Sequence, residues 1–342
     1  MVKVGIWGYG GIASIHRRNY AALEAEGIPV KLVSVCDIRE EQFTQEVAIN
    51  ITDPNAKPLP PIEKTYTDID DMLANEDLDM IDICLPGFMH REAAIKCLKM
   101  GYHVLSEKPM ALKEEDVDAM IKVAKESKGI LQIGQCLRFN PQNQFIREAI
   151  KTGKYGKVIN ATFLRHSSAP LWSWENWFMD KEKSGGVLFD LHCHDIDLIN
   201  FFFGLPKKVS TLTTGVEEKF SGVDTAFTTL VYDDGKVVSA KADWMLPKSY
   251  QFEAKYIINF EKATLAAEKG GKLVIYTDDE RIESDIMPKE HNIGAEIRYL
   301  VSRIENGVVD DIIPIESTAN TIRLECAMKK SSENCGQFVE LG

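Results

Sequence analysis

The sequence predicts two domains: an α/β domain with a parallel sheet, followed by an α+β domain with a large, mostly antiparallel open sheet. Strands and helices alternate from residue 2 to about 134, which is typical of a parallel sheet covered by helices on both faces. After residue 206 the pattern changes to successive strands, with a hairpin signal at Asp233-Asp234-Gly235. A chain of 342 residues can also bury two cores. We place the domains at residues 1–125 and 126–342.

Composition excludes several classes of protein. The net charge of −12 argues against nucleic acid or an anionic membrane as the partner. The chain runs from Met1 directly into a strand, so we expect no secretory signal, and no apolar run is long enough to span a membrane. The seven cysteines are scattered, odd in number and never spaced as Cys-x-x-Cys, which favours reduced thiols and a cytoplasmic protein.

The first strand is expected at residues 2–7 and the first helix runs to about residue 26. The turn between them reads Gly-x-Gly-x-x-Ala. The first glycine permits a tight turn, the second lets the backbone approach a pyrophosphate, and a small third residue allows the helix to pack on the strand. The helix N-terminus then offers free N–H groups to the phosphates. The turn predicts dinucleotide binding by Gly8, Gly10, Gly11, Ile12 and Ala13.

The second strand, residues 30–36, ends at Asp37. A carboxylate at this point can accept hydrogen bonds from the adenosine ribose hydroxyls and would repel a 2′-phosphate, so NAD is favoured over NADP. Arg39 works against this preference because an arginine can accommodate the phosphate. Alternatively, Asp37 only caps the turn that follows its strand.

The rest of the first domain continues the alternation. We expect helices at 40–50, 68–75, 90–100 and 116–128, strands at 80–86, 103–106 and 130–134, and a proline-rich surface loop at 53–61. Ligands of such sheets bind at the carboxyl ends of the strands. Asp37, Pro86 and Glu107-Lys108-Pro109 all lie at carboxyl ends.

The second domain is expected to be rich in strands. Strands are predicted at 158–167, 209–216, 225–232, 237–244, 250–260 and 272–276, and helices at 295–306 and 318–333. Three tryptophans and a phenylalanine crowd one loop after the first of these strands, namely Trp172, Trp174, Trp177 and Phe178.

The stretch from Ser184 to Asp197 opens with two glycines and is predicted to form a helix. On one helix, Asp190 and His194 share a face, so the carboxylate could hold an imidazole that serves as general acid and base. Asp197 would fall one turn further along, and His192, about 200° away, would point elsewhere. The alternative is a capping Asp and a buried His. Only Asp190, His194 and Asp197 could converge on a metal ion here, and we expect none.

These motifs resemble the Gfo/Idh/MocA oxidoreductases from end to end. The matching segments are Gly8–Ala13, Asp37, Pro86 with His90, Gly101–Pro109, Arg138–Pro141, and Gly185-Gly186 leading to Asp190 and His194. The chain departs from the family at His192, where many members have a small residue. The resemblance implies an NAD(P)-binding Rossmann domain that also uses Pro86, His90, Glu107 and Lys108 for the cofactor. It further implies a homodimer or homotetramer assembled through the second sheet.

The resemblance also implies an activity, that of an NAD(P)-dependent dehydrogenase or reductase acting on CH–OH groups. The expected substrate is a sugar, inositol or related polyol. Lys108 would lie at the reacting oxygen, His194 would be the acid/base, and Asp190 its partner. Sugar faces stack on aromatic rings, so Trp177 is a candidate substrate contact, with core packing as the alternative. Arg138 is a candidate polar contact. Two other activities stay open: a redox-neutral NAD-dependent glycosidase and a non-catalytic NAD(H)-sensing regulator.

Overall fold

The computed structural model describes residues 1–44, 49, 58–59, 61–216, 220–267, 271–307, 309 and 312–341. They form two compact units. Unit 1 comprises Met1–Ala111, Glu115–Cys136 and Glu290–Glu316, and unit 2 comprises Leu112–Glu114, Leu137–Lys289 and Ser317–Gly342. The division therefore differs from the single predicted boundary after residue 125, because a segment near the C-terminus completes unit 1.

Unit 1 is built on a six-stranded sheet in the order β3-β2-β1-β4-β5-β6. All its strand pairs are parallel, as the alternating pattern predicted. The strands are β1 (Val2–Trp7), β2 (Val30–Cys36), β3 (Thr65–Tyr66), β4 (Met80–Ile83), β5 (His103–Glu107) and β6 (Leu131–Gly134). The order reverses at β1 and β4, so the crevice for a ligand is expected at the carboxyl ends of these strands.

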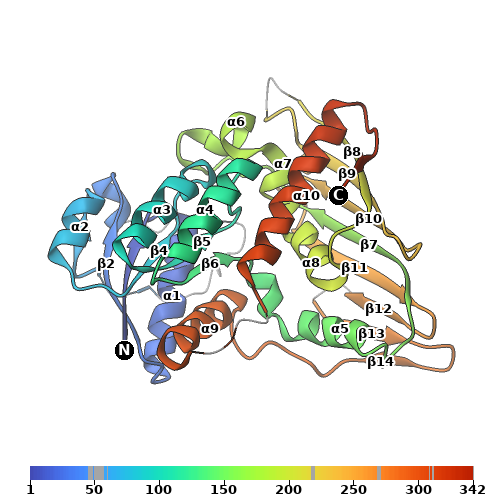
Figure 1. Ribbon diagram of the computed structural model, residues 1–342, viewed down its shortest axis with the longest axis horizontal. Helices are drawn as coiled ribbons and strands as arrows, with labels where there is room; N and C mark the ends of the chain where they lie inside the picture. Colours follow the sequence, from blue (N-terminus) through green and yellow to red (C-terminus); the bar gives the residue numbers. More distant parts are fainter. Residues whose placement is uncertain are drawn as a thin grey trace. The chain divides into compact units, whose positions relative to one another are not determined.

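Helices cover both faces of this sheet (Figure 1). The α-helices are α1 (Gly11–Ala25), α2 (Ile69–Asn75), α3 (His90–Met100), α4 (Glu114–Glu126) and α9 (Asn292–Asn306), with 3-10 turns η1 (Glu40–Thr44), η2 (Gly87–Met89) and η3 (Cys136–Phe139) near them in sequence. Of the helix predicted at 40–50, only η1 lies in the described part. Most of the proline-rich loop at 53–61 lies outside the described residues.

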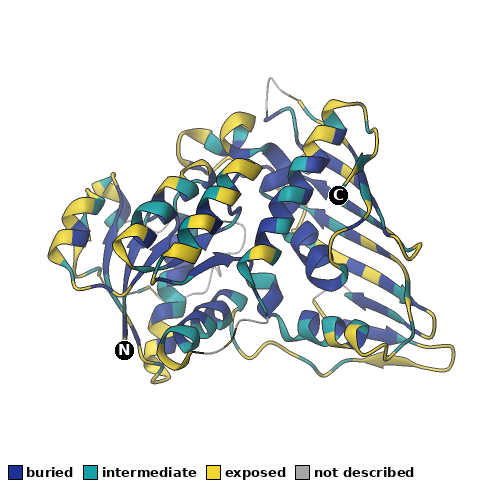
Figure 2. Ribbon diagram, viewed as in Figure 1, coloured by how far each residue is buried: buried dark blue, intermediate teal, exposed yellow. Residues whose placement is uncertain are grey.

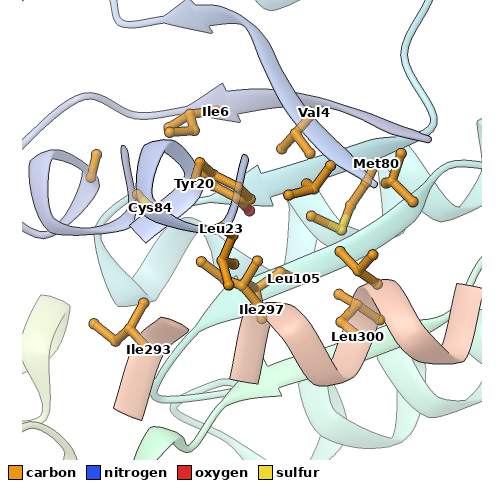
Figure 3. Close-up of a cluster of buried hydrophobic side chains, with 14 of the residues drawn as sticks. Val4, Ile6, Tyr20, Leu23, Met80, Cys84, Leu105, Ile293, Ile297 and Leu300 are labelled. Carbon is orange, nitrogen blue, oxygen red and sulfur yellow. The ribbon is translucent and has the colours of Figure 1, made fainter. Parts of the chain in front are cut away.

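Helix α9 explains why residues 290–316 join unit 1. Ile293, Ile297 and Leu300 recur at helical spacing on one face and are all buried. Figure 3 shows this face pointing toward Leu23 of α1 and Leu105 of β5, within one continuous apolar cluster. Hydrophobic burial therefore fixes α9 against the sheet of unit 1.

Unit 2 contains a nine-stranded sheet in the order β14-β13-β12-β11-β7-β10-β9-β8-β15. Only the pair β7–β10 is parallel within these nine strands as described, which confirms the predicted mostly antiparallel sheet. The strands are β7 (Val158–His166), β8 (Lys208–Thr214), β9 (Thr225–Val231), β10 (Val237–Asp243), β11 (Glu253–Phe260), β12 (Thr264–Ala267), β13 (Leu273–Tyr276), β14 (Arg281–Glu283) and β15 (Val339–Glu340). The pattern had not indicated the short strands β3, β12, β14 and β15.

One face of this sheet is covered by helices. Alternate residues of β7 are buried, among them Phe163 and Arg165, while Ile159 and Thr162 are exposed. Figure 2 shows α8 buried along most of its length and the strands alternating between buried and exposed. The helical segments are η4 (Trp174–Met179), α5 (Pro141–Lys151), α6 (Lys181–Ser184), α7 (Gly186–Phe189), α8 (Cys193–Phe203) and α10 (Ile315–Glu333). The described residues contain no helix that is both long and apolar enough to cross a membrane.

The single helix predicted across Asp190 and His194 is wrong. Helix α7 ends at Phe189 and α8 begins at Cys193, with a turn over residues 190–192. Within this turn the amide of His192 donates to the carbonyl of Val187, five residues back, so the i to i−4 pattern is interrupted. Asp190 and His194 therefore come from a helix end and the next helix start rather than from one helix face.

Candidate functional site

The glycine turn lies between β1 and α1. Gly8 has φ +92°, and a Cβ there would come within 2.8 Å of the Cys84 carbonyl oxygen, so glycine is required. A Cβ on Gly10 would meet nothing within 4 Å. Gly10 is the N-cap of α1, makes no side-chain cap, and no acidic residue follows in the first turn. The open space, the uncapped amides and the positive helix end together fit a bound pyrophosphate.

Asp37 joins the glycine turn to the end of β2. Its Oδ2 accepts the backbone N–H of Tyr9 at 2.8 Å, and its Oδ1 accepts Nε of Arg39 at 3.1 Å. Asp37 is 7% exposed. Arg39 thus bonds the same carboxylate that the sequence assigned to the ribose. Both open readings of this position, ribose acceptor and turn-fixing residue, are compatible with this geometry.

His90, expected near the cofactor, is buried at the start of α3. Its Nδ1 lies 2.7 Å from the carbonyl oxygen of Pro109 and its Nε2 lies 2.8 Å from that of Leu85. Burial lowers the pKa of His90 against the opposing effect of these two carbonyls. The ring therefore links the loop that contains Pro86 to the Glu107-Lys108-Pro109 segment.

Glu107 ends β5 and is held by a histidine that sequence reasoning did not single out. The Nε2 of His16, on α1, lies 3.0 Å from Oε1 of Glu107, and its Nδ1 lies 2.7 Å from Oδ2 of Asp82 on β4. The other carboxylate oxygen of Glu107 accepts the backbone N–H of Lys108 at 3.0 Å. Glu107 therefore fixes the backbone of Lys108, which is itself partly accessible.

These side chains form a buried ionisable cluster under the strand ends. Burial lowers the pKa of His16, but the charges and hydrogen bonds of Asp82 and Cys84 together outweigh burial, and the pKa is raised well above its ordinary value. Burial raises the pKa of Glu107, yet the hydrogen bond and charge of His16, together with the charges of Lys108 and His90, leave that pKa lowered. Burial and the charge of Glu107 raise the pKa of Glu296, on α9, whose carboxyl oxygens have no hydrogen-bond partner among the described residues.

In unit 2, Asp190 and His194 stand out by exposure. From Gly186 to Phe202 all residues are buried except Asp190 and His194, which are partly accessible. Gly185, with φ +72°, ends α6 and begins the turn that leads into α7. The prediction of a single helix was wrong. Asp190 and His194, the two residues that this helix was predicted to place on one face, are nevertheless the two that the segment leaves accessible.

The flanking acids of α8 are occupied elsewhere. Asp197 is 1% exposed, accepts both Nε and an Nη of Arg138 at 2.8 and 2.6 Å, and also accepts the Thr321 hydroxyl. Asp195 accepts Arg165 in the same bidentate way, at 3.1 and 2.8 Å. The carboxylate of Asp197 is therefore already engaged by Arg138 and Thr321, and the structure places Arg138, an expected substrate contact, in the interior of unit 2.

His192 contacts the sheet; the expectation that it would point away from Asp190 and His194 assumed one continuous helix, which the structure does not have. The Nε2 of His192 lies 3.1 Å from the hydroxyl of Thr228 on β9, and the ring has no exposed surface. Burial and the charge of Arg165 lower the pKa of His192 to about 3. His192 is thus a neutral core residue.

The aromatic residues of the loop gather around Phe178. Trp177 stacks on it with ring centroids 3.9 Å apart, and Trp172 and Trp244 approach it edge-on at 5.6 and 6.3 Å. Trp172 and Trp174 are 39% and 37% exposed, whereas Trp244 is buried. The sequence had not included Trp244, which comes from the end of β10.

Potential metal ligands gather only in unit 1 among the described residues. Two triplets have donor atoms within 4.8 Å of one another: His16, Asp82 and Cys84, and His16, Glu107 and Glu296. The hydrogen bonds given above already account for both nitrogens of His16. In the described chain, Asp190, His194 and Asp197 do not form such a group.

The chain matches two family models, one in each half. Residues 2–135 match an oxidoreductase family with an NAD-binding Rossmann fold, and residues 143–266 match the GFO/IDH/MocA C-terminal domain. The first segment belongs to unit 1 apart from Leu112–Glu114, and the second lies within unit 2.

Curated relatives include two inositol dehydrogenases. The chain is 26% identical over 286 residues to myo-inositol 2-dehydrogenase of Thermotoga maritima, covering 82% of this chain and 72% of that protein. It is 25% identical over 340 residues to scyllo-inositol 2-dehydrogenase (NAD(+)) of Bacillus subtilis, covering 93% and 91%. A shorter match, 32% over 154 residues, is to 2,7-anhydro-N-acetylneuraminate hydratase of Mediterraneibacter gnavus, covering 44% and 40%.

Solved structures share the whole fold. An oxidoreductase from Agrobacterium radiobacter in complex with NAD+, L-tartaric acid and magnesium superimposes with a TM-score of 0.81 at 18% identity, covering 99% of this chain and 98% of that one. The WlbA dehydrogenase from Bordetella pertussis, in complex with NADH and UDP-GlcNAcA, gives 0.79 at 22% identity, covering 100% and 99%. At these identities the similarity establishes the fold.

Proposed function

Because this chain belongs to the GFO/IDH/MocA family and is an NAD(P)-dependent oxidoreductase, we propose that it transfers a hydride between nicotinamide and a carbinol or carbonyl carbon of a sugar, inositol or related polyol. The observation that carries the residue assignment is the exposure pattern of residues 186–202. Only Asp190 and His194 are accessible there, and they have the side chains needed for proton transfer.

In this proposal the cofactor is held by unit 1. The amides of Gly11, Ile12 and Ala13 face the pyrophosphate, and Asp37 faces the adenosine ribose, which favours NAD over NADP. Pro86, His90, Glu107 and Lys108 shape the strand ends at which the nicotinamide would bind. Bound NAD supplies the hydride acceptor, and the protein supplies position and charge.

The protein side chains handle the proton and the charge. His194 accepts the hydroxyl proton as hydride leaves, and Asp190 orients the imidazole and favours its charged form. The ammonium of Lys108 stabilises the alkoxide that develops on the reacting oxygen. Trp177 offers an aromatic face to a sugar ring. Arg138 is left out because its guanidinium is buried against Asp197.

A second candidate is a redox-neutral reaction. The relative named as a hydratase supports it, because addition of water involves no net oxidation. The corresponding reading of this chain is glycoside cleavage with NAD retained. It predicts product formation from a chromogenic glycoside without accumulation of NADH. A regulator that only senses NAD(H) would show neither activity.

The deciding experiment is a panel of polyols, inositols and sugars with NAD or NADP, followed by the absorbance of reduced nicotinamide. Turnover of one polyol with NAD supports the proposal. Glycoside cleavage without net NADH supports the second candidate. Binding of NAD with no turnover of either kind would contradict both.

With the substrate found, we expect His194→Asn to lower kcat by about 10²- to 10⁴-fold, the usual contribution of a general acid/base. The Kd for NAD should change by less than about threefold, since the variant keeps the charge of unit 1. His166→Asn, which changes a partly accessible histidine of β7 in the same unit, serves as the control. Equal losses in both variants would refute the assignment.

A homodimer or homotetramer through the unit 2 sheet is part of the same proposal. Large apolar side chains are about half exposed on its strands, at Ile159, Leu212, Phe227 and Ile257. Apolar exposure of this kind is typical of a surface that another subunit covers.

We also propose a cytoplasmic protein. The seven cysteines are all free, which suits a reducing cytoplasm.

A further inference from the structure

His16 has no role in the reaction proposed above, yet it is fully buried between two carboxylates of unit 1, Asp82 and Glu107. We propose that His16 is a positioning residue: as an imidazolium between Asp82 and Glu107, it fixes the end of β5 and thereby the place of Lys108. The consequence for catalysis rests on the proposed function of Lys108, whereas the imidazolium and the fixed strand end do not.

The hydrogen-bond partners of His16 require two N–H groups. Nδ1 faces Oδ2 of Asp82 at 2.7 Å and Nε2 faces Oε1 of Glu107 at 3.0 Å. A neutral imidazole has only one N–H, so one of these contacts would place a lone pair against a carboxylate oxygen. Both contacts are favourable only when both nitrogens carry hydrogen.

Both carboxylates behave as acceptors toward their other neighbours as well. Asp82 also accepts the Tyr20 hydroxyl at 2.8 Å and lies 3.7 Å from the Cys84 thiol. Glu107 accepts the Lys108 amide through its second oxygen. An ionised carboxylate accepts only, which matches every one of these contacts. Two buried, ionised carboxylates need a cation between them, and His16 supplies it.

The path from His16 to Lys108 is short and rigid. His16 holds Oε1 of Glu107, and Oε2 of the same carboxylate holds the Lys108 amide. Gly134 of β6 pairs with Glu107 of β5. A Cβ on Gly134 would lie 3.2 Å from Oε1 of Glu107, so the absence of a side chain at Gly134 leaves room for this carboxylate. On the far side of Lys108, His90 bonds the carbonyl of Pro109. Lys108 is thus held at both of its neighbours.

The other titratable groups around His16 do not replace it as the cation. Burial raises the pKa of Glu296 and favours its neutral form, and burial likewise raises the pKa of the Cys84 thiol to about 12 and that of Cys136 well above its ordinary value. Burial and the proximity of His16 lower the pKa of His291. The charges of Lys108 and His90 also help to lower the pKa of Glu107. His16 is the group whose two ring nitrogens contact both carboxylates, Asp82 and Glu107.

The first test is ¹⁵N NMR of protein with labelled histidines, with NAD bound, at about pH 8, which is above the ordinary histidine pKa of about 6.5. We expect both ring nitrogens of His16 to carry hydrogen. His192 is the internal control: it too has no exposed surface, but it contacts a hydroxyl and faces Arg165, and we expect it to be neutral. A neutral His16 would overturn the proposal, as would a stoichiometric divalent ion bound at Nε2.

The second test compares two double variants that both remove the charge of Asp82, so that neither leaves it uncompensated. His16→Gln/Asp82→Asn keeps a donor for Glu107, whereas His16→Leu/Asp82→Asn has none. We expect protection of the Lys108 amide from hydrogen exchange to survive in the first and to be lost in the second. Equal protection in two folded variants would refute the path through Glu107.

Activity gives the third readout once a substrate is known. Misplacement of a reacting group by about 1 Å can cost about 10²-fold in rate. We expect a loss of that order in kcat for the Leu/Asn variant, substantial rescue in the Gln/Asn variant, and a similar Kd for NAD in both. If no substrate is found, the proposed function fails, but the NMR and exchange results still decide the role of His16. Unchanged kcat in the Leu/Asn variant with an unprotected Lys108 amide would show that Lys108 needs no such positioning.

Discussion

The carboxylate of Asp37 makes two structural contacts. It accepts the Tyr9 amide from the glycine turn and pairs with Arg39, which is close enough to serve a 2′-phosphate if released. The preference between NAD and NADP therefore depends on the charge of Asp37 and on where it keeps Arg39.

Replacing this carboxylate should shift cofactor preference. We expect Asp37→Ser to raise the affinity for NADPH relative to NADH by at least about tenfold, because the repulsion of the phosphate is removed and Arg39 is freed; this corresponds to about 1.4 kcal/mol. Fluorescence titration of both reduced cofactors measures the ratio. Asp68→Ser, which removes the acidic N-cap residue of α2 in unit 1, is the control. An unchanged ratio would mean that Asp37 only stabilises the turn.

Two histidines without exposed surface show how surroundings decide a residue's state. His16 lies between two carboxylates and its pKa is raised, whereas His192 lies beside Arg165 and a hydroxyl and its pKa is lowered to about 3. Burial disfavours the charged form of both, and at His16 the charges and hydrogen bonds of Asp82 and Cys84 together reverse this effect.

At the scale of elements, the junction from α6 through α7 to α8 presents the proposed acid/base pair. Gly185 is in the left-handed region at φ +72° and ψ 8°, and a Cβ there would lie 2.4 Å from the ring of Phe189. Phe189 is 1% exposed and cannot move aside. The junction therefore needs glycine for two reasons, conformation and space.

Comparing two glycine-to-alanine variants separates these reasons. Gly101→Ala, at φ +93° and ψ 5° with nothing within 4 Å, should lose about 1–2 kcal/mol of unfolding free energy from conformation alone. Gly185→Ala should lose about 1–3 kcal/mol more, because the methyl group overpacks the core at Phe189. Urea unfolding of both variants measures the difference. Equal losses would show that the Phe189 contact relaxes freely.

For the whole molecule, two buried histidines shape stability against pH in opposite directions. The pKa of His192 is about 3 in the folded chain and about 6.5 when unfolded, so the unfolded state binds more protons between these values and stability falls as pH falls through that window. The pKa of His16 is raised, so its contribution is complete below about 6.5 and is lost as pH rises through its folded value.

The fall of unfolding free energy at acid pH can be tested with one variant. We expect His192→Asn to flatten the decline of unfolding free energy below about pH 6.5 by up to about 1.4 kcal/mol per pH unit. Stability between about pH 7 and 8 should keep its slope, since His192 is neutral in both states there. Unfolding free energies measured in urea across this range give both slopes. An equally steep decline of unfolding free energy at acid pH in the variant and in the natural chain would contradict a buried, neutral His192.

The exposed apolar residues of the unit 2 sheet make the assembly testable. We expect light scattering to give a dimer or tetramer, and Phe227→Glu to convert it to a monomer with unchanged circular dichroism, because a charge would be buried on assembly. Ile38→Glu, at a residue of unit 1 that is 69% exposed, should leave the oligomer intact. A natural chain that is already monomeric would refute the proposed interface.

Local signals in the sequence determined the alternating parallel sheet, the glycine turn, Asp37 at its strand end and the strand-rich second half, and they suggested Asp190 and His194 as a pair; the role of Lys108 was implied by the family resemblance. Such local signals depend on near neighbours in sequence, through turn geometry and hydrophobic periodicity. The strands β3, β12 and β15, of two to four residues, were not recognised, and each pairs with a longer strand that supplies its hydrogen bonds.

Only the tertiary structure decided the rest. It joined α9 to unit 1 across more than half of the chain, broke the predicted helix before His194, and turned Arg138 and Asp197 into a buried pair. It also assembled His16, Asp82, Glu107 and Glu296 from four separate elements. The physical reason is that burial and charge pairing depend on neighbours in space, which local patterns of residues do not encode.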